Sequence, residues 1–251
     1  MGEILSLALG VIWGSFFNVC IVRIPEGQSV VRGRSHCPKC KAPIHWYHNI
    51  PLFSYCMLRG RCQACGQPIS LQYPLIEAAT ALIFLWVYHQ YGWSLKFLFS
   101  AIFISDLLVI SVIDFYHQII PDGLSLGGMA VGFIVSFLGG EVSWVQSLLG
   151  ILIGGGTFFA VSFLYEKIAK REGLGGGDVK LLAMIGAWLG PQSILFTILI
   201  SSALGSIVGV SLMIGRKKDL KSAIPFGPFL ALAAVIYQRW GEILENLFFQ
   251  H

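Results

Sequence analysis

Long apolar segments cover most of the chain and alternate with short polar connections. A helix needs about 20 largely apolar residues to cross a bilayer. Seven segments approach this length: 3–22, 73–91, 95–113, 123–139, 144–166, 192–214 and 224–240. An eighth apolar segment, at 180–190, is shorter, and only residues 23–72 form a long polar stretch. The pattern predicts an all-α polytopic membrane protein with about eight transmembrane helices.

The composition agrees with a protein that lies in a lipid bilayer. Of the 251 residues, 12% are Asp, Glu, Lys or Arg and 55% are apolar, whereas soluble proteins carry roughly 25% charged residues. These values exclude a soluble globule, a disordered chain and a secreted disulfide scaffold. Met1-Gly2-Glu3 carries no positive side chain and no small-residue cleavage site follows the first segment. We therefore expect a retained anchor instead of a cleaved signal peptide.

The basic residues are concentrated in three connections and predict the topology. All of the 17 Lys and Arg residues except Lys96 and Arg239 lie within 23–72, 166–180 and 215–221. If the chain alternates sides through eight spans, these loops share one face, which the positive-inside rule assigns to the cytoplasm. The connection at 114–122 falls on the same side. We interpret the basic loops as this topological bias and expect no nucleic-acid partner.

Two C-x-x-C pairs lie in the polar stretch, with 21 residues between them. They are Cys37-Pro38-Lys39-Cys40 and Cys62-Gln63-Ala64-Cys65. Two such turns complete a tetrahedron of thiolates around Zn²⁺. Disulfides, another metal such as iron, or an empty site are the alternatives, but thiols stay reduced in the cytoplasm. The spacing predicts a small cytoplasmic zinc-ribbon-like loop whose metal is structural, because the four cysteines leave no ligand position for water.

Two aspartates lie at the predicted cytoplasmic ends of apolar segments. Asp114 ends the third segment, and Asp178 closes the G-x-G-D stretch 175–178. Ionisable groups at membrane depth are costly and indicate function. Two carboxyls that share one proton can perform aspartyl proteolysis, one activating water and the other polarising the scissile carbonyl. The alternatives are that Asp178 caps a helix and Asp114 faces water; Asp122 is expected to N-cap the next helix, and Asp106 has no assigned role.

These motifs together resemble those of bacterial prepilin peptidases, the type IV leader peptidases of the GxGD aspartyl protease class. The resemblance runs over nearly the whole chain and includes 14–25, the paired C-x-x-C motif, 73–77, 113–122 and 175–180. It implies that Asp114 and Asp178 are catalytic. It also implies removal of a basic leader from type IV prepilins or type II secretion pseudopilins at the cytoplasmic face of the bacterial inner membrane. N-methylation of the new amino terminus by S-adenosylmethionine would follow.

The second implied activity is assigned to residues 1–91, which include the cysteine loop, and the peptidase to residues 92–240. The residues expected to form a polar pocket for the methyl donor are Asn18, Arg23, Gly60, Arg61 and Glu77. Three of them have structural alternatives: Asn18 as an interhelical contact, Arg23 as a topology anchor, and Glu77 as a helix-dipole partner. Residues 241–251 are treated as a tail, because they resemble the protease-cleavage sequence of an expression tag.

Two other functions fit parts of the sequence. One is an ion-coupled transporter in which Asp106, Asp114 and Asp178 line the ion path and the zinc loop docks a partner. The clustering of Asp114 and Asp178 at one face argues against it, because an ion path needs ionisable groups throughout the membrane depth. The other is a peptidase without methyl transfer, since no glycine-rich Rossmann fingerprint is present. Pilin-like precursors and the lipid bilayer are the expected partners, and the oligomeric state is open.

Overall fold

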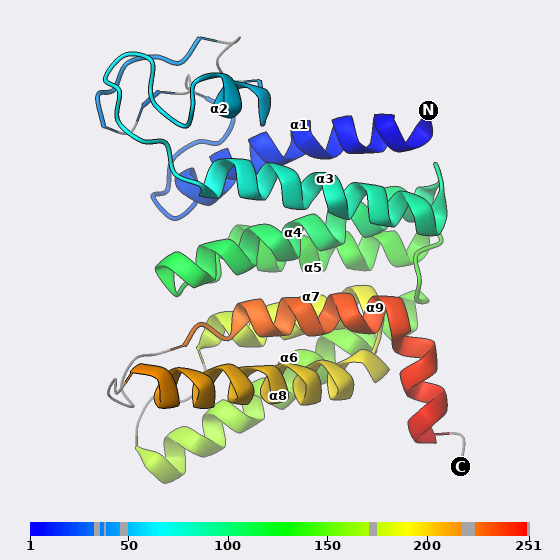
Figure 1. Cartoon of the computed structure of the whole chain (residues 1–251). Helices are drawn as coiled ribbons and strands as arrows, with labels where there is room; N and C mark the ends of the chain where they lie inside the picture. Colours follow the sequence, from blue (N-terminus) through cyan, green and yellow to red (C-terminus); the bar gives the residue numbers. More distant parts are fainter. Residues whose placement is uncertain (33–35, 38, 46–49, 171–174, 217–223, 250–251) are drawn as a thin grey trace. The chain divides into compact units, whose positions relative to one another are not determined.

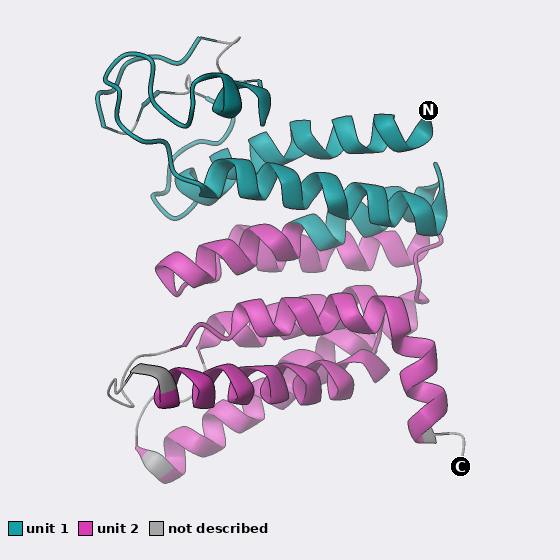
Figure 2. Ribbon diagram, in the orientation of Figure 1, with its two compact units in different colours: residues 1–105 teal, residues 106–251 magenta. Residues whose placement is uncertain are grey.

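The computed structural model of the protein describes residues 1–32, 36–37, 39–45, 50–170, 175–216 and 224–249. In these residues the regular structure is helical (Figure 1), and the β pairing consists of two isolated bridges. The chain forms two compact units, Met1–Ser105 and Asp106–His251 (Figure 2). Each unit has its own packing and is described by itself.

The helices lie where the apolar segments predicted them. Unit 1 contains α1 (Gly2–Arg23), α2 (Phe53–Met57) and α3 (Gln72–Tyr91), and α4 (Leu95–His117) begins in it. Unit 2 contains the end of α4, then α5 (Asp122–Phe137), α6 (Trp144–Ala169), α7 (Gly176–Leu189), α8 (Gln192–Arg216) and α9 (Gly227–Phe249). Only α2, a single turn within the cysteine loop, was not predicted. Residues 241–249, expected to be a tail, continue α9.

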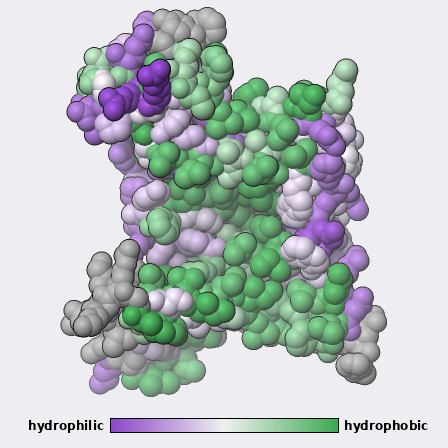
Figure 3. Space-filling view, in the orientation of Figure 1, coloured by the Kyte–Doolittle hydropathy of each residue, from purple (hydrophilic) through white to green (hydrophobic). Residues whose placement is uncertain are grey.

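Four of the described helices are long and apolar enough to cross a membrane. They are Gly2–Arg23, Leu95–His117, Trp144–Ile168 and Gln192–Ile214. On the face seen in Figure 3, hydrophobic residues cover much of the helices, and hydrophilic residues lie toward the helix ends and on part of the cysteine loop. On α6, for example, Leu152, Phe159 and Leu164 are exposed. Apolar surface of this extent is typical of a protein whose helices face lipid.

Small residues allow α1 and α3 to pack closely in unit 1. A Cβ atom added to Gly10 would lie 2.6 Å from the Cα of Ala81, and one added to Gly14 would lie 2.7 Å from the Cα of Glu77. The two glycines are four residues apart and therefore lie on one face of α1. Glycines at this spacing allow helix backbones to approach within membranes. The contact brings Glu77 against α1.

α7 is the central helix of unit 2. Every residue from Leu181 to Leu189 is buried, and α7 contacts α5, α6, α8 and α9. A Cβ atom added to Gly150 of α6 would lie 2.6 Å from the carbonyl carbon of Gly186 on α7, so the two backbones touch. With 14 residues, α7 is about 21 Å long, shorter than the bilayer core. Residues 181–189 of α7 are apolar on every face of the helix, as is typical of a helix that other helices surround.

Candidate active site and cysteine cluster

Asp114 lies in the last turn of α4 and is buried, with 6% of its surface exposed. Its Oδ2 accepts a hydrogen bond of 2.9 Å from the backbone N–H of Gly227. Gly227 is the first residue of α9, so the beginning of that helix points its free N–H group at the carboxyl. The alternative in which Asp114 faces water is wrong, because the carboxyl is buried against the beginning of α9.

Asp178 lies in the first turn of α7, which begins after the N-cap residue Gly175. Its backbone N–H donates to the carbonyl of Gly175 at 3.0 Å, but its side chain makes no capping hydrogen bond, so the capping alternative is wrong. The carboxyls of Asp114 and Asp178 lie close enough for their charges to interact. The structure thus brings the two predicted aspartates together. Two carboxyls that repel each other share a proton, which suits acid–base hydrolysis.

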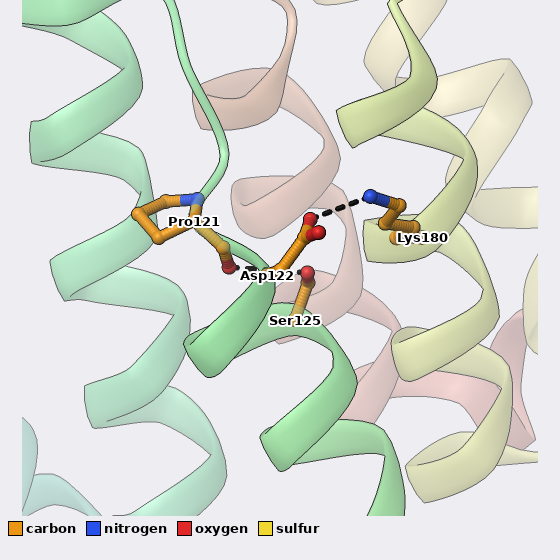
Figure 4. Close-up of polar contacts among 4 residues, drawn as sticks. All are labelled: Pro121, Asp122, Ser125 and Lys180. Carbon is orange, nitrogen blue, oxygen red and sulfur yellow. Dashed lines mark hydrogen bonds and ion pairs between the residues drawn. The ribbon is translucent and has the colours of Figure 1, made fainter. Parts of the chain in front are cut away.

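Asp122 and Lys180 join the beginning of α5 to the beginning of α7 (Figure 4). The Lys180 Nζ and the Asp122 Oδ1 are 2.5 Å apart, and both side chains remain partly exposed. The prediction that Asp122 caps α5 is wrong: Pro121 is the N-cap residue, and Asp122 is the first helical residue. A carboxylate at this position still interacts favourably with the helix dipole, and here it pairs with a lysine two residues after Asp178.

Asp106 lies two turns before Asp114 on α4. Its Oδ2 faces Gly128 of α5, whose missing Cβ leaves room for the carboxyl and for Met184 of α7. Gly128 also accepts a hydrogen bond of 2.8 Å from the Trp188 indole through its carbonyl. The carboxyl of Asp106 is thus enclosed by helix packing within unit 2. Two helical turns of α4 separate the Asp106 carboxyl from Asp114, so Asp106 does not lie directly beside the Asp114–Asp178 pair.

The two C-x-x-C motifs form matching turns in unit 1. The backbone N–H of Cys37 donates to the carbonyl of Ala42, and that of Cys62 donates to Gln67, at 2.9 and 2.8 Å. The residue after each second cysteine has a positive φ, 59° at Lys41 and 68° at Gly66. These turns bring the sulfur atoms of Cys37, Cys40, Cys62 and Cys65 within 4.8 Å of one another.

The cysteine cluster fits a tetrahedral metal ion. Zinc–sulfur bonds of about 2.3 Å place the sulfurs of a tetrahedron roughly 3.8 Å apart, so a small contraction of the cluster suffices. All four cysteines are free thiols. The backbone N–H of Cys40 donates to the sulfur of Cys37 and lowers the pKa of that thiol to about 6. A low pKa favours the thiolate that binds metal.

Glu77 and Asn18 meet where α3 packs against α1. The Glu77 Oε2 accepts a hydrogen bond of 2.7 Å from the backbone N–H of Leu52, just before α2, and the Ser15 hydroxyl also bonds this carboxyl. The Asn18 side chain donates to the carbonyl of Tyr73 at 3.0 Å, while its buried Oδ1 has no hydrogen-bond partner among the residues that the structure describes. Glu77 thus connects the cysteine loop to the helix pair. The orphaned oxygen of Asn18 can accept one more hydrogen bond.

The other three methyl-donor candidates lie on the loop side of unit 1. Arg23 ends α1 and donates to the carbonyls of Ser29 and Arg32 at 3.0 and 3.1 Å. Gly60 has a φ of 65° and lies against the hydroxyl end of Tyr55. Arg61 is exposed and forms an isolated bridge with Pro68, beside Cys62. Arg23 therefore folds the loop onto α1, whereas Gly60 and Arg61 belong to the second cysteine turn.

Two features of the sites were not found from the sequence. The first is Gly227, whose signal is the segment Pro225-Phe226-Gly227-Pro228, since Gly and Pro before an apolar helix mark a special backbone. The second is the hydrogen bond from the backbone N–H of Leu52 to Glu77, which no feature of the sequence indicates. Leu52 has a φ of 60°, a conformation that is rare for residues other than glycine.

Comparison with known proteins finds relatives that match most of the chain. Residues 8–91 match the bacterial peptidase A24 N-terminal domain, and residues 101–210 match the type IV leader peptidase family. The prepilin leader peptidase/N-methyltransferase of Pseudomonas putida is 36% identical over 95% of this chain and 90% of its own length. The enzymes of the same name from Pseudomonas aeruginosa and Aeromonas hydrophila are each 35% identical over 98% of this chain, and the matches cover 92% and 98% of their lengths. No solved structure matches the chain. The chain belongs to the type IV leader peptidase family.

Proposed function

We propose that this protein is a membrane aspartyl endopeptidase and N-methyltransferase. It removes the basic leader from type IV prepilins or type II secretion pseudopilins and then methylates the new amino terminus with S-adenosylmethionine. The observation that carries the proposal is the approach of Asp114 and Asp178, from the end of α4 and the beginning of α7. The names of the relatives, which state both activities, support it.

The proposed topology places both sites at the cytoplasmic face of the bacterial inner membrane. The eight helices α1 and α3–α9 cross or enter the bilayer, and both termini lie outside. The ends of α1, α4, α6 and α8 and the beginnings of α3, α5, α7 and α9 then face the cytoplasm. Asp114, Asp178 and the cysteine loop all lie at these helix ends. The basic side chains of the cytoplasmic loops support this orientation.

The cysteine loop holds one structural zinc ion through Cys37, Cys40, Cys62 and Cys65. Four thiolates complete the tetrahedron and leave no position for a reacting water. The ion would supply folding energy to a loop whose described residues contain one turn of helix and two isolated bridges. Removal of the metal should therefore unfold the loop before it affects α4–α9.

The methyl donor binds on unit 1, where the loop meets α1 and α3. Asn18 fits an amine donor, because within the described part of the chain its buried Oδ1 has no hydrogen-bond partner. Glu77 holds the loop against α3 through Leu52 and supplies negative charge near a sulfonium. Arg23, Gly60 and Arg61 form the rest of this polar surface. S-adenosylmethionine supplies the methyl group, and the protein binds and orients the donor and the free amine of the processed pilin.

The test is a reaction of purified protein in detergent with a prepilin, with and without S-adenosylmethionine, followed by intact mass. The protein should remove the leader in both reactions and add one methyl group only with the donor. Asp114→Asn and Asp178→Asn should each abolish cleavage, because each removes half of the shared-proton pair. Both variants should still methylate a pilin that has already been cleaved.

The test also separates the alternatives. Cleavage without methylation would identify a peptidase alone, and normal cleavage by either folded Asn variant would refute the assignment of the pair. Absence of cleavage by the wild-type protein, combined with aspartate-dependent ion flux in vesicles, would favour a transporter.

A further inference from the structure

The two carboxyls of the candidate active site have different hydrogen-bond partners. The buried Asp114 carboxyl accepts the N–H of Gly227 at 2.9 Å. Asp178 is less buried, and within the described part of the chain its carboxyl accepts no hydrogen bond. A backbone N–H can donate but cannot accept, so it favours a carboxylate over a carboxylic acid. The hydrogen bond from Gly227 therefore favours the ionised form of Asp114, and Asp178 has no matching bond within the described residues.

The backbone at the beginning of α9 comes close enough to contact the Asp114 carboxyl directly. A Cβ atom added to Gly227 would lie 2.7 Å from the Asp114 Oδ2 and 3.2 Å from its Cγ, so only glycine allows the backbone to come this close. α9 has 23 residues, and the positive end of its dipole adds to the effect of the N–H. The first turns, 227–234, contain no ionisable side chain. The N–H of Gly227 is therefore the group that α9 presents to Asp114.

We propose that Gly227 is a positioning residue that holds Asp114 ionised, so that Asp114 is the general base and Asp178 the general acid. This inference rests on the proposed function and assigns the roles within the aspartyl pair. It also makes the N-terminus of α9 a third part of the active site, beside the ends of α4 and α7.

The assignment gives a balanced reaction. The Asp114 carboxylate takes a proton from water while the water oxygen bonds to the scissile carbonyl carbon, and Asp178 gives its proton to the carbonyl oxygen. The resulting gem-diol then breaks its C–N bond. Asp114 passes its proton to the leaving amine nitrogen, and Asp178 regains a proton from one hydroxyl of the diol. Both aspartates return to their starting states.

Other charged groups around the pair must be considered for a pH test. The ionisable side chains on the described helices nearby are Asp106 and His117 on α4, Asp122 on α5, Asp178 and Lys180 on α7, and Glu166 and Lys167 on α6. Lys180 is paired with Asp122, and Glu166, Lys167 and His117 are exposed. Of these groups, Asp178 is the one close enough to interact with the charge of Asp114.

The test compares pH–rate profiles of prepilin cleavage for wild-type protein and Gly227→Ala. The new Cβ displaces the carboxyl from the N–H, so the acid limb should move to higher pH by about one unit. At a fixed pH on that limb, kcat should therefore fall about 10-fold. The basic limb, which reports loss of the proton from Asp178, should stay in place. Gly123→Ala is the matched control, because this glycine in the first turn of α5 has nothing within 4 Å of an added Cβ.

A second variant removes the N–H without adding a side chain. Replacement of Gly227 by glycolic acid turns its amide into an ester, and the acid limb should move as in Gly227→Ala. Methylation of a previously cleaved pilin should be unchanged in both variants, which verifies folding. A shift of the basic limb alone would reverse the roles of the aspartates and overturn the proposal, as would an unchanged profile in the ester variant. Absence of cleavage by the wild-type protein would refute the proposed function instead.

Discussion

Replacement of Gly150 by alanine should separate α6 from α7 and impair cleavage from a distance. The added Cβ would lie 2.6 Å from the carbonyl carbon of Gly186, whereas ordinary contacts begin at 3.4 Å. The Gly186 atom belongs to the backbone of α7, and the position of the added Cβ is fixed by the backbone of α6, so no side chain can turn away to make room. The helices must therefore move apart by roughly 1 Å.

The magnitude follows from this displacement. Overpacking of a close-packed interior costs about 1–3 kcal/mol, which should lower the thermal midpoint in detergent by roughly 3–10 °C. Gly186 lies eight residues after Asp178 on α7, about 12 Å along the helix axis. Because α7 moves as a rigid element, Asp178 shifts with it. Misplacement of a catalytic group by about 1 Å can cost 10²-fold, so we expect kcat for cleavage to fall 10- to 100-fold.

The assay combines thermal unfolding with single-turnover cleavage of a prepilin. Gly156→Ala on the same helix is the matched control, since nothing lies within 4 Å of its added Cβ. This control should be as stable as wild type or slightly more stable, because alanine favours helix over glycine by about 1 kcal/mol. Methylation of a cleaved pilin should be unchanged in both variants. Equal stability and activity of Gly150→Ala and Gly156→Ala would refute the reasoning.

Three further predictions concern the other contacts. The pure protein should contain close to one zinc ion per chain. Cys62→Ser should lower this zinc content and make the loop sensitive to an added protease, while prepilin cleavage by the enzyme declines less. A zinc-free protein with full activity would contradict this prediction. Glu77→Gln weakens a charge-assisted hydrogen bond from the backbone N–H of Leu52. It should reduce methylation by roughly 10-fold or more with little loss of cleavage. An equal loss of methylation and cleavage would count against the methyl-donor site. Lys180→Met and Asp122→Asn should each reduce cleavage by at most about 5-fold and be non-additive when combined. A raised KM for Asp122→Asn alone would instead assign Asp122 to binding of the basic leader.

The sequence by itself determined the parts of the protein that depend on local pattern. The apolar segments predicted α1 and α3–α9, because the length of an apolar run decides where a helix can lie in lipid. The C-x-x-C spacing predicted the cysteine cluster, since each pair of ligands sits on one short turn. Asp114 and Asp178 were recognisable because charges at the ends of apolar helices are costly.

Only the tertiary structure decided which of these parts meet. The shortest apolar segment became α7, the centre of unit 2, and its burial depends on four surrounding helices. Asp122 was expected to cap α5 but pairs with Lys180, 58 residues away. Asp114 bonds Gly227 across 113 residues. Such contacts arise from helix packing at a few glycines, where the absence of a side chain permits close approach, and the local pattern of a chain does not specify which backbone fills that space.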